Sequence, residues 1–128
     1  MKTQYAVGVA TLAAFTLGAL AVHGLHAQTR APVYLIEEVQ VTDTDGFVKE
    51  AVPKFLAVNK AGGVRALAAG GKTTAIEGDP PKPRIIIQVW DSAEKMQEFR
   101  NSADYKEARK IADKYAKFRV FAVEGIAQ

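Results

Sequence analysis

The stretch Arg84-Ile85-Ile86-Ile87-Gln88-Val89-Trp90-Asp91-Ser92-Ala93-Glu94 decides the fold, because it contains a strand, a turn and the start of a helix. In residues 84–90 the odd-numbered positions carry only Ile and Val, and the even-numbered ones also carry Arg84, Gln88 and Trp90. This alternation predicts a strand with two distinct faces. The segment 91–94 is typical of a helix start, where polar side chains accept hydrogen bonds from free backbone N–H groups and acidic residues are favourable.

Before this stretch, the sequence predicts a strand, a helix and a second strand. Residues 33–41 alternate, with Val33, Leu35, Val39 and Val41 on one face and Tyr34, Ile36, Glu38 and Gln40 on the other. A helix is expected over 45–60, with a kink at Pro53, because proline removes one helical hydrogen bond. Gly62-Gly63 ends it, and a strand follows over 64–69.

Residues 70–83 are expected to add a hairpin. Gly70-Gly71 fits a tight turn, residues 73–77 a short returning strand, and residues 78–83 an exposed loop rich in proline. After residue 94 the sequence predicts a helix to Asn101, a second helix over 103–115 and a last strand over 118–124.

The element order is therefore β-α-β-(β)-β-α-α-β, an α+β chain with the split βαβ pattern of a ferredoxin-like fold. The helices would cover one face of an antiparallel sheet. The other face would carry Ile36, Ile86, Trp90 and either Phe118 or Phe121. Such an apolar face predicts a homodimer in which two copies pack sheet to sheet.

The N-terminal residues read as an export signal. Lys2 precedes an almost wholly apolar run over 5–22, and the small Ala27 follows. A charged start, an apolar core and a small residue at the cut predict a secretory signal peptide over 1–27, a linker over 28–32 and a domain over 33–125. The protein is then periplasmic or secreted. The alternatives are a retained membrane anchor, since the run reaches the short limit for a bilayer span, and a buried core helix.

Composition limits the chemistry. The chain of 128 residues has 48% hydrophobic and 24% charged residues, a net charge of +3 and no cysteine, and its two histidines, His23 and His26, both precede the expected cut. Metal sites built from thiolate or imidazole, and Ser-His-Asp or Cys-His catalysis, are thereby excluded for the exported domain. We expect no metal and no cofactor. Without a basic block carrying interleaved aromatics, nucleic-acid binding is not expected either.

Several short motifs occur in the order found in one bacterial family. They are Tyr34-Leu35-Ile36 with Glu38, Val41-Thr42-Asp43, Val52-Pro53, Gly62-Gly63, Gly70-Gly71-Lys72, and the segments 77–81, 101–105, 114–119 and 123–125. Over residues 33–125 the chain resembles the family called domain of unknown function 1330, in the dimeric α/β-barrel superfamily. The resemblance implies a ferredoxin-like fold that pairs as a dimeric α/β barrel, and no established reaction. Members often carry an arginine where this chain has Ala69, a place that only Arg65 of the same strand could fill.

Candidate cavity residues are the acids, tyrosines and arginines near the sheet. If both strand faces line the barrel, Glu38 meets Arg84 or Arg65, and a buried carboxylate there can act as a general base. The alternative for Glu38 is a structural ion pair or a dimer contact, and Glu37 is its neighbour on the other face. The other candidates are Tyr34, Gln88, Trp90, Tyr105 and Arg109. For Trp90 and Tyr105 the alternative is packing, and for Arg109 a pair with Asp113.

Two classes of function stay open. The first is an exported homodimeric module that binds a small apolar or weakly acidic molecule, or has a structural role. The second is a cofactor-independent enzyme, similar to a monooxygenase or an isomerase, that uses cavity Glu, Tyr and Arg side chains.

Overall fold

The computed structural model describes residues 30–128, so the expected signal peptide lies outside the described residues. The elements in chain order are β1 (Val33–Val41), α1 (Thr44–Gly46), the π-helical turn η1 (Phe47–Ala51), α2 (Val52–Ala61), β2 (Arg65–Ala69), β3 (Arg84–Trp90), α3 (Ala93–Asn101), α4 (Ala103–Ala112) and β4 (Ala116–Glu124). Among these residues no helix is long and apolar enough to cross a bilayer.

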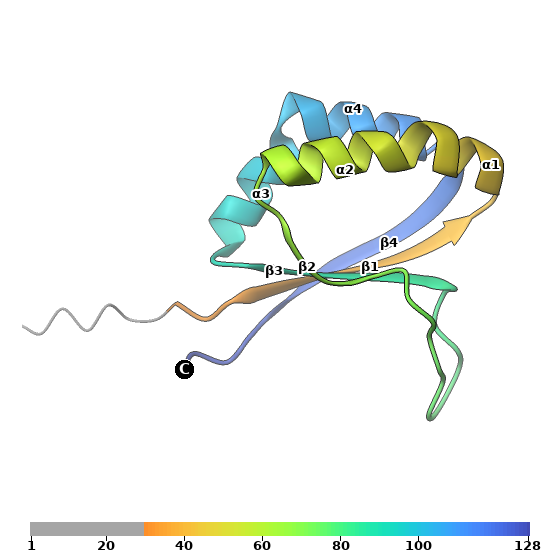
Figure 1. Cartoon of the computed structure of the whole chain (residues 1–128). Helices are drawn as coiled ribbons and strands as arrows, with labels where there is room; N and C mark the ends of the chain where they lie inside the picture. Colours follow the sequence, from red (N-terminus) through yellow and green to blue (C-terminus); the bar gives the residue numbers. More distant parts are fainter. Residues whose placement is uncertain (1–29) are drawn as a thin grey trace, which may run out of the picture.

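The four strands form one antiparallel sheet in the order β2-β3-β1-β4. All the helices lie on one face of this sheet (Figure 1). The α+β fold with helices on one face is therefore confirmed. The predicted strands β1 and β3 have the expected bounds, while β4 begins two residues earlier and α4 ends three residues earlier than predicted.

The prediction of an extra hairpin over residues 70–83 is wrong. Residues 71–83 contain no strand, and they form an irregular excursion that projects away from the helix layer (Figure 1). Gly70 does adopt a positive φ of 77°, but Gly71 does not, so the pair makes no two-residue turn. Gly78 and the prolines at 80, 81 and 83 interrupt any regular pairing here, since proline lacks the N–H that a ladder needs.

The helix that begins at Asp43 accommodates Pro53 without stopping. The Asp43 carboxylate accepts a hydrogen bond from the Gly46 N–H at 3.0 Å and caps the start. In η1 the chain takes one wider turn, and Val52 N–H donates to Phe47 O five residues back. Pro53 then stands in the first turn of α2, where its missing N–H is tolerated. The irregularity expected at Pro53 thus takes the form of a π-helical turn before it.

Register defines two faces of the sheet. Val33, Leu35, Glu37, Val39 and Val41 of β1 lie on the helix-facing side, together with Arg84, Ile86, Gln88 and Trp90 of β3. Two groups of buried residues form the core on this side: Val39 with Phe47, Ala51, Ala112 and Ala116, and Val33 with Leu35, Trp90 and Met96.

The side away from the helices, which we call the open face, carries a different set than predicted. Ile36 and Phe121 do lie on it, but Ile86, Trp90 and Phe118 face the helices. The four strands are predicted, but some of their residues are assigned to the wrong side of the sheet. The register pairs Ile36 with Ile87 of β3 and with Phe121 of β4, so these three residues share the open face and the residues next to Ile87 and Phe121 in sequence face the helices. The open face consists of Tyr34, Ile36, Glu38, Gln40, Arg65, Ala68, Ile85, Ile87, Val89, Lys117, Arg119, Phe121 and Val123.

Candidate functional site

A cavity of about 300 Å³ lies between α2 and the helix-facing side of the sheet. Leu56 on α2 and the cavity-lining Ala66 and Ala69 on β2 are exposed, so the cavity opens to solvent between α2 and this edge strand. Its walls are mostly apolar and its polar side chains are few. The lining residues are Glu37, Phe47, Val52, Phe55, Leu56, Asn59, Lys60, Val64, Ala66, Ala69, Arg84, Ile86, Gln88, Tyr105 and Phe118.

Small residues on β2 create part of this space. Ala66 and Ala69 lie on the helix-facing side, opposite Gln88 and Ile86, and a β-bulge between Ala66 and Ala68 brings both to the same side. Methyl groups here leave room that larger side chains would fill. Ala69 is thus part of the cavity wall.

Glu37 is the carboxylate of the cavity. It follows the alternation of β1 onto the helix-facing side and is only 6% exposed. Its Oε1 lies 3.6 Å from Nη1 of Arg100 on α3. Burial raises the pKa of Glu37 above its ordinary value, and the charges of Arg100 and Arg109 offset part of that rise.

Tyr105 lies beside this ion pair at the start of α4. Arg100 Nη1 donates a hydrogen bond to the Tyr105 hydroxyl at 2.7 Å, and its guanidinium stands 5.0 Å from the ring centre. Burial, followed by the negative charge of Glu37, raises the pKa of Tyr105, although Arg100 and Arg109 act in the opposite direction. The hydroxyl is therefore protonated at neutral pH and can donate a hydrogen bond.

Arg84 supplies the cavity with a guanidinium from β3. Within residues 30–128, its Nε is the one buried side-chain nitrogen or oxygen with no hydrogen-bond partner. The guanidinium stands 5.8 Å from the ring centre of Phe47 and packs against Gly70, where a Cβ would lie 2.9 Å from Arg84 Cζ. Gly70 thus leaves room for this arginine. An unpaired buried donor is costly, so a ligand oxygen that accepts from it would be favoured.

Glu37 is flanked by two polar side chains of β3. Register places Glu37 opposite Ile86, so Arg84 and Gln88, two residues to either side, are its diagonal neighbours on the same face. Such neighbours lie about 7–8 Å apart. Gln88 is 4% exposed and its Oε1 accepts a hydrogen bond from Trp90 Nε1 at 3.1 Å, which fixes its orientation.

The structure divides the sequence-predicted residues into two groups. Arg84, Gln88 and Tyr105 line the cavity. Trp90 is a core residue packed against Phe99, with ring centres 5.1 Å apart, and does not line the cavity. Arg109 pairs with Asp113 at 2.8 Å. This pairing and the packing of Trp90 were the alternatives considered above.

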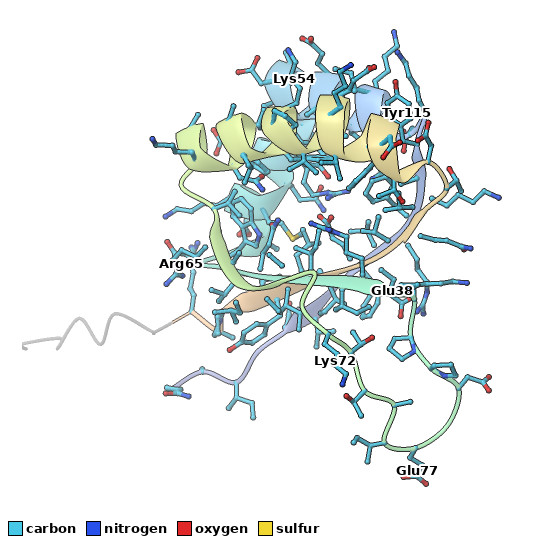
Figure 2. The ribbon with its side chains drawn as sticks, turned by 45° about the vertical axis from the view of Figure 1, so that its right-hand side comes forward. Glu38, Lys54, Arg65, Lys72, Glu77 and Tyr115 are labelled. Atoms are coloured by element: carbon cyan, nitrogen blue, oxygen red, sulfur yellow. The ribbon has the colours of Figure 1, made fainter. Side chains whose placement is uncertain are left out.

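The expected meeting of Glu38 with Arg84 or Arg65 is wrong, because Glu38 and Arg84 lie on opposite faces of the sheet. Glu38 accepts a hydrogen bond from Arg119 of β4 at 3.0 Å on the open face. Arg65 pairs with Asp91 at 2.9 Å and does not fill the place beside Ala69. Figure 2 shows Arg65 and Glu38 toward opposite ends of the sheet. Tyr34 is also on the open face.

Sequence reasoning gave Glu37 no functional role and did not consider Arg100. A signal for Glu37 exists in the pattern Val33, Leu35, Val39, Val41, since position 37 belongs to the same apolar series. An acid in such a series is either buried with a partner or marks an error of register. No comparable signal exists for Arg100, which lies in a polar helix among other charged residues.

Comparisons with known proteins agree with this fold. A conserved protein of unknown function from Bacteroides thetaiotaomicron, described as a possible oxidoreductase, is 16% identical, with a TM-score of 0.51 over 74% of this chain and 98% of that one. A putative antibiotic biosynthesis monooxygenase from Caulobacter crescentus is 10% identical, with a TM-score of 0.51 over 81% and 98%. Another from Nitrosomonas europaea is 8% identical, with a TM-score of 0.52 over 76% and 92%.

At these identities the likeness shows the fold alone, and no curated protein matches the chain. The family model described as Domain of unknown function (DUF1330) matches residues 32–126. This match covers most of the chain and all the described strands and helices, and the protein accordingly belongs to the DUF1330 family.

Proposed function

We propose that this domain binds a small, largely apolar molecule with one weakly acidic or carbonyl end in the cavity beneath α2. The observation that carries this proposal is the combination of apolar walls with the unpaired Arg84 Nε. Ligand cavities have this composition, with few polar groups that fix orientation, and a volume of about 300 Å³ is at the lower end of their range. The apolar part of the ligand would contact Phe47 and Phe55, and its oxygen would accept from Arg84.

The test fills the cavity and measures binding. Benzoate, phenol and cyclohex-3-enone are the probes, and titration is followed by calorimetry and by the fluorescence of Trp90, the one tryptophan of the chain. In Ala66→Phe the new ring occupies cavity space, and affinity for the probes that bind should fall about tenfold or more. Ala57→Phe on the exposed side of α2 is the matched control and should bind as the unmodified domain does. Equal affinity of both variants, or no binding of any probe, would refute the proposal.

A second candidate function is a cofactor-independent enzyme. Glu37 favours it, because a buried carboxylate with a raised pKa inside an apolar cavity is suited to accept and return a proton. The putative monooxygenases named above share the fold, which supports this candidate only by analogy.

We propose further that the domain is a homodimer formed through the open face. Phe121 and Val123 are 39% and 49% exposed there, beside half-buried isoleucines of β1 and β3. Two charge pairs lie at this face, Glu38 with Arg119 and Arg65 with Asp91, and Lys117 opposite Gln40 adds a cation toward one end of the sheet. A face of this kind suits a two-fold symmetric contact.

Light scattering at micromolar concentration tests the dimer. The unmodified domain should have the mass of two chains, and Phe121→Asp should have the mass of one, because a charge at the centre of an apolar contact is costly to bury. Val48→Asp is the control, since Val48 is 55% exposed in η1, in the helix layer on the other side of the sheet. A mass of one chain for the unmodified domain would rule the dimer out.

We also propose that residues 1–27 are removed on export to the periplasm or the medium. Their composition supports this, with a basic start, an apolar run and Ala27 before the cut. Intact mass measurement of the protein expressed from the full-length sequence should give a chain that begins at Gln28. A chain that begins at Met1 in the cytosolic fraction would contradict the proposal.

A further inference from the structure

We propose that the cavity is catalytic, with Glu37 as the base that moves a proton between two carbons of a small apolar carbonyl compound, a β,γ-unsaturated ketone or ester. This inference rests on the proposed function, because the compound must first occupy the cavity. It assigns a reaction class, a substrate class and a role for each polar side chain on the sheet floor.

The placement of Glu37 and Arg84 supports this assignment. They are diagonal neighbours on adjacent strands of one sheet face, both line the cavity, and such positions lie about 7–8 Å apart. A carbonyl compound in the cavity would place its oxygen toward the Arg84 guanidinium and its α-hydrogen toward the Glu37 carboxylate, since both residues line the cavity. Gln88, the other diagonal neighbour, lies about 13 Å from Arg84 along β3, and its carbonyl oxygen is engaged by Trp90, so its amide N–H₂ can donate at the opposite end of the cavity.

The surroundings of Glu37 suit a base that takes and returns a proton. Its ion-pair partner Arg100 is 3.6 Å away, a contact longer than a good hydrogen bond, and is itself hydrogen-bonded to Tyr105. The charges that face the carboxylate are those of Arg100 and Arg109, with the neutral Tyr105 hydroxyl beside them. Burial raises its pKa, which makes the carboxylate a stronger base than a solvated one.

The proposed step balances without an oxidant or a cofactor. The Glu37 carboxylate removes the proton from the carbon between the carbonyl group and the C=C bond. The electron pair of that C–H bond forms a dienolate, whose negative oxygen accepts from the Arg84 guanidinium and is stabilised by its charge. The carboxylic acid of Glu37 then delivers the proton to the γ-carbon. One C–H bond is broken and one is formed, and the C=C bond moves into conjugation with the carbonyl.

The apolar wall contributes to this reaction. Phe47, Phe55 and Ile86 line the cavity together with Glu37 and reduce the access of water to its carboxylate, so a fraction of the abstracted protons is retained for return to the substrate. Part of the hydrogen recovered at the γ-carbon should therefore come from the substrate and not from solvent.

The experiment uses cyclohex-3-enone as the probe, with the domain as purified. Isomerisation to cyclohex-2-enone is followed by the ultraviolet absorbance of the conjugated enone, and proton transfer by NMR in D₂O. Binding of the same probe is measured in parallel by calorimetry. Glu37→Gln keeps the shape of the side chain and removes the base, and the neighbouring Glu38→Gln alters a carboxylate on the opposite face of the same strand. Circular dichroism verifies the fold of both variants.

We expect the unmodified domain and Glu38→Gln to isomerise the probe equally. Glu37→Gln should retain binding and isomerise at least about a hundredfold more slowly, as the loss of a general base predicts. Because Glu37→Gln could disturb Arg100, Glu37→Asp provides a second variant that keeps the charge and should recover part of the rate. Recovery in Glu37→Asp with loss in Glu37→Gln separates a base from a merely structural carboxylate.

Each contrary outcome identifies what has failed. If the probe binds and neither isomerisation nor deuterium exchange occurs, the catalytic inference is overturned and ligand binding stands. If Glu37→Gln isomerises as fast as the unmodified domain, Glu37 is not the base. If cyclohex-3-enone and the other two probes fail to bind at millimolar concentration, the proposed function fails and the catalytic inference falls with it.

Discussion

Replacing Arg100 with methionine should destabilise the domain by an amount that grows with pH. The side chain is 23% exposed, and its guanidinium is both the ion-pair partner of Glu37 and the donor to the Tyr105 hydroxyl. Methionine keeps the length and apolar contacts of the arginine stem while it removes both interactions. Glu37 is then a buried carboxylate without its nearest cation.

The magnitude follows from the two interactions. Loss of one partner of a buried ion pair costs about 3–5 kcal/mol, and we take about 2 kcal/mol because the 3.6 Å contact is longer than a hydrogen bond and Arg100 is partly solvated. Loss of the hydrogen bond to Tyr105 adds about 1 kcal/mol. The free energy of unfolding should therefore fall by about 3 kcal/mol at a pH at which Glu37 is ionised in the folded domain, and pH 8 is the upper end of the titration.

The pH dependence has a definite sign. The pKa of Glu37 is raised in the folded domain, so its contribution to stability is full below the unfolded value and is lost as the pH rises through the folded value. Without Arg100 the folded pKa rises further, and this loss becomes larger. At pH 4 the carboxyl is protonated, and the variant should lose only about 1 kcal/mol, the part that belongs to Tyr105.

Urea unfolding followed by circular dichroism between pH 4 and pH 8 measures both quantities. Lys95→Met is the matched control: Lys95 is also on α3 and also forms an ion pair, with Asp91, but that pair is exposed on both sides. Its effect on stability should be small and should not change over this pH range. An equal cost of Arg100→Met at pH 4 and pH 8 would refute the reasoning, because the charge of Glu37 would then play no part in it.

Two further predictions concern the elements that position the cavity. Gly70→Ala should destabilise the domain by about 1–2 kcal/mol, because Gly70 has a positive φ and lies against Arg84. The added methyl group should also displace the Arg84 guanidinium and weaken probe binding. Gly71→Ala is the control: Gly71 has open space around it, and the substitution should change neither stability nor binding. Thermal melts and calorimetry measure these effects, and equal behaviour of the two variants would contradict the assigned role of Gly70. Ser92→Ala removes the side-chain oxygen that accepts a hydrogen bond from Lys95 N–H at the start of α3. The free energy of unfolding measured in urea should fall by about 1 kcal/mol. An unchanged urea midpoint would show that this cap does not stabilise the helix.

The sequence predicts the elements better than it predicts their faces. β1 and β3 are bounded as expected, because β-branched residues alternate with polar ones and polar turns follow. In β3, however, three successive isoleucines put apolar residues on both faces, so periodicity alone does not say which face meets the helices. The helix-facing position of Ile86 and Trp90 depends on packing against residues distant in sequence.

Because periodicity does not say which side of the sheet meets the helices, the sequence predicts only part of the candidate site. Arg84, Gln88 and Tyr105 are found by residue type, since few side chains of this chain can do chemistry. The sequence pattern pairs them with Glu38, because it assigns Arg84, Gln88 and Trp90 to the same side of the sheet as Glu38, whereas the register puts them on the opposite side. Glu37 and Arg100 are 63 positions apart in numbering, and only the tertiary fold brings them together.

The π-helical turn at 47–51 amounts to one residue more than a regular helix would need between Asp43 and Gly62. A regular helix advances the side-chain direction by about 100° per residue, whereas the wider π turn advances it less, so the additional residue is absorbed locally and the residues after it keep their direction. A one-residue deletion in η1 would therefore restore a regular helix and leave Phe55 at the cavity roof, whereas a deletion of Lys54 within α2 would turn Phe55 away from it. Relatives that lack one residue in η1 would thus keep both the fold and the ligand surface.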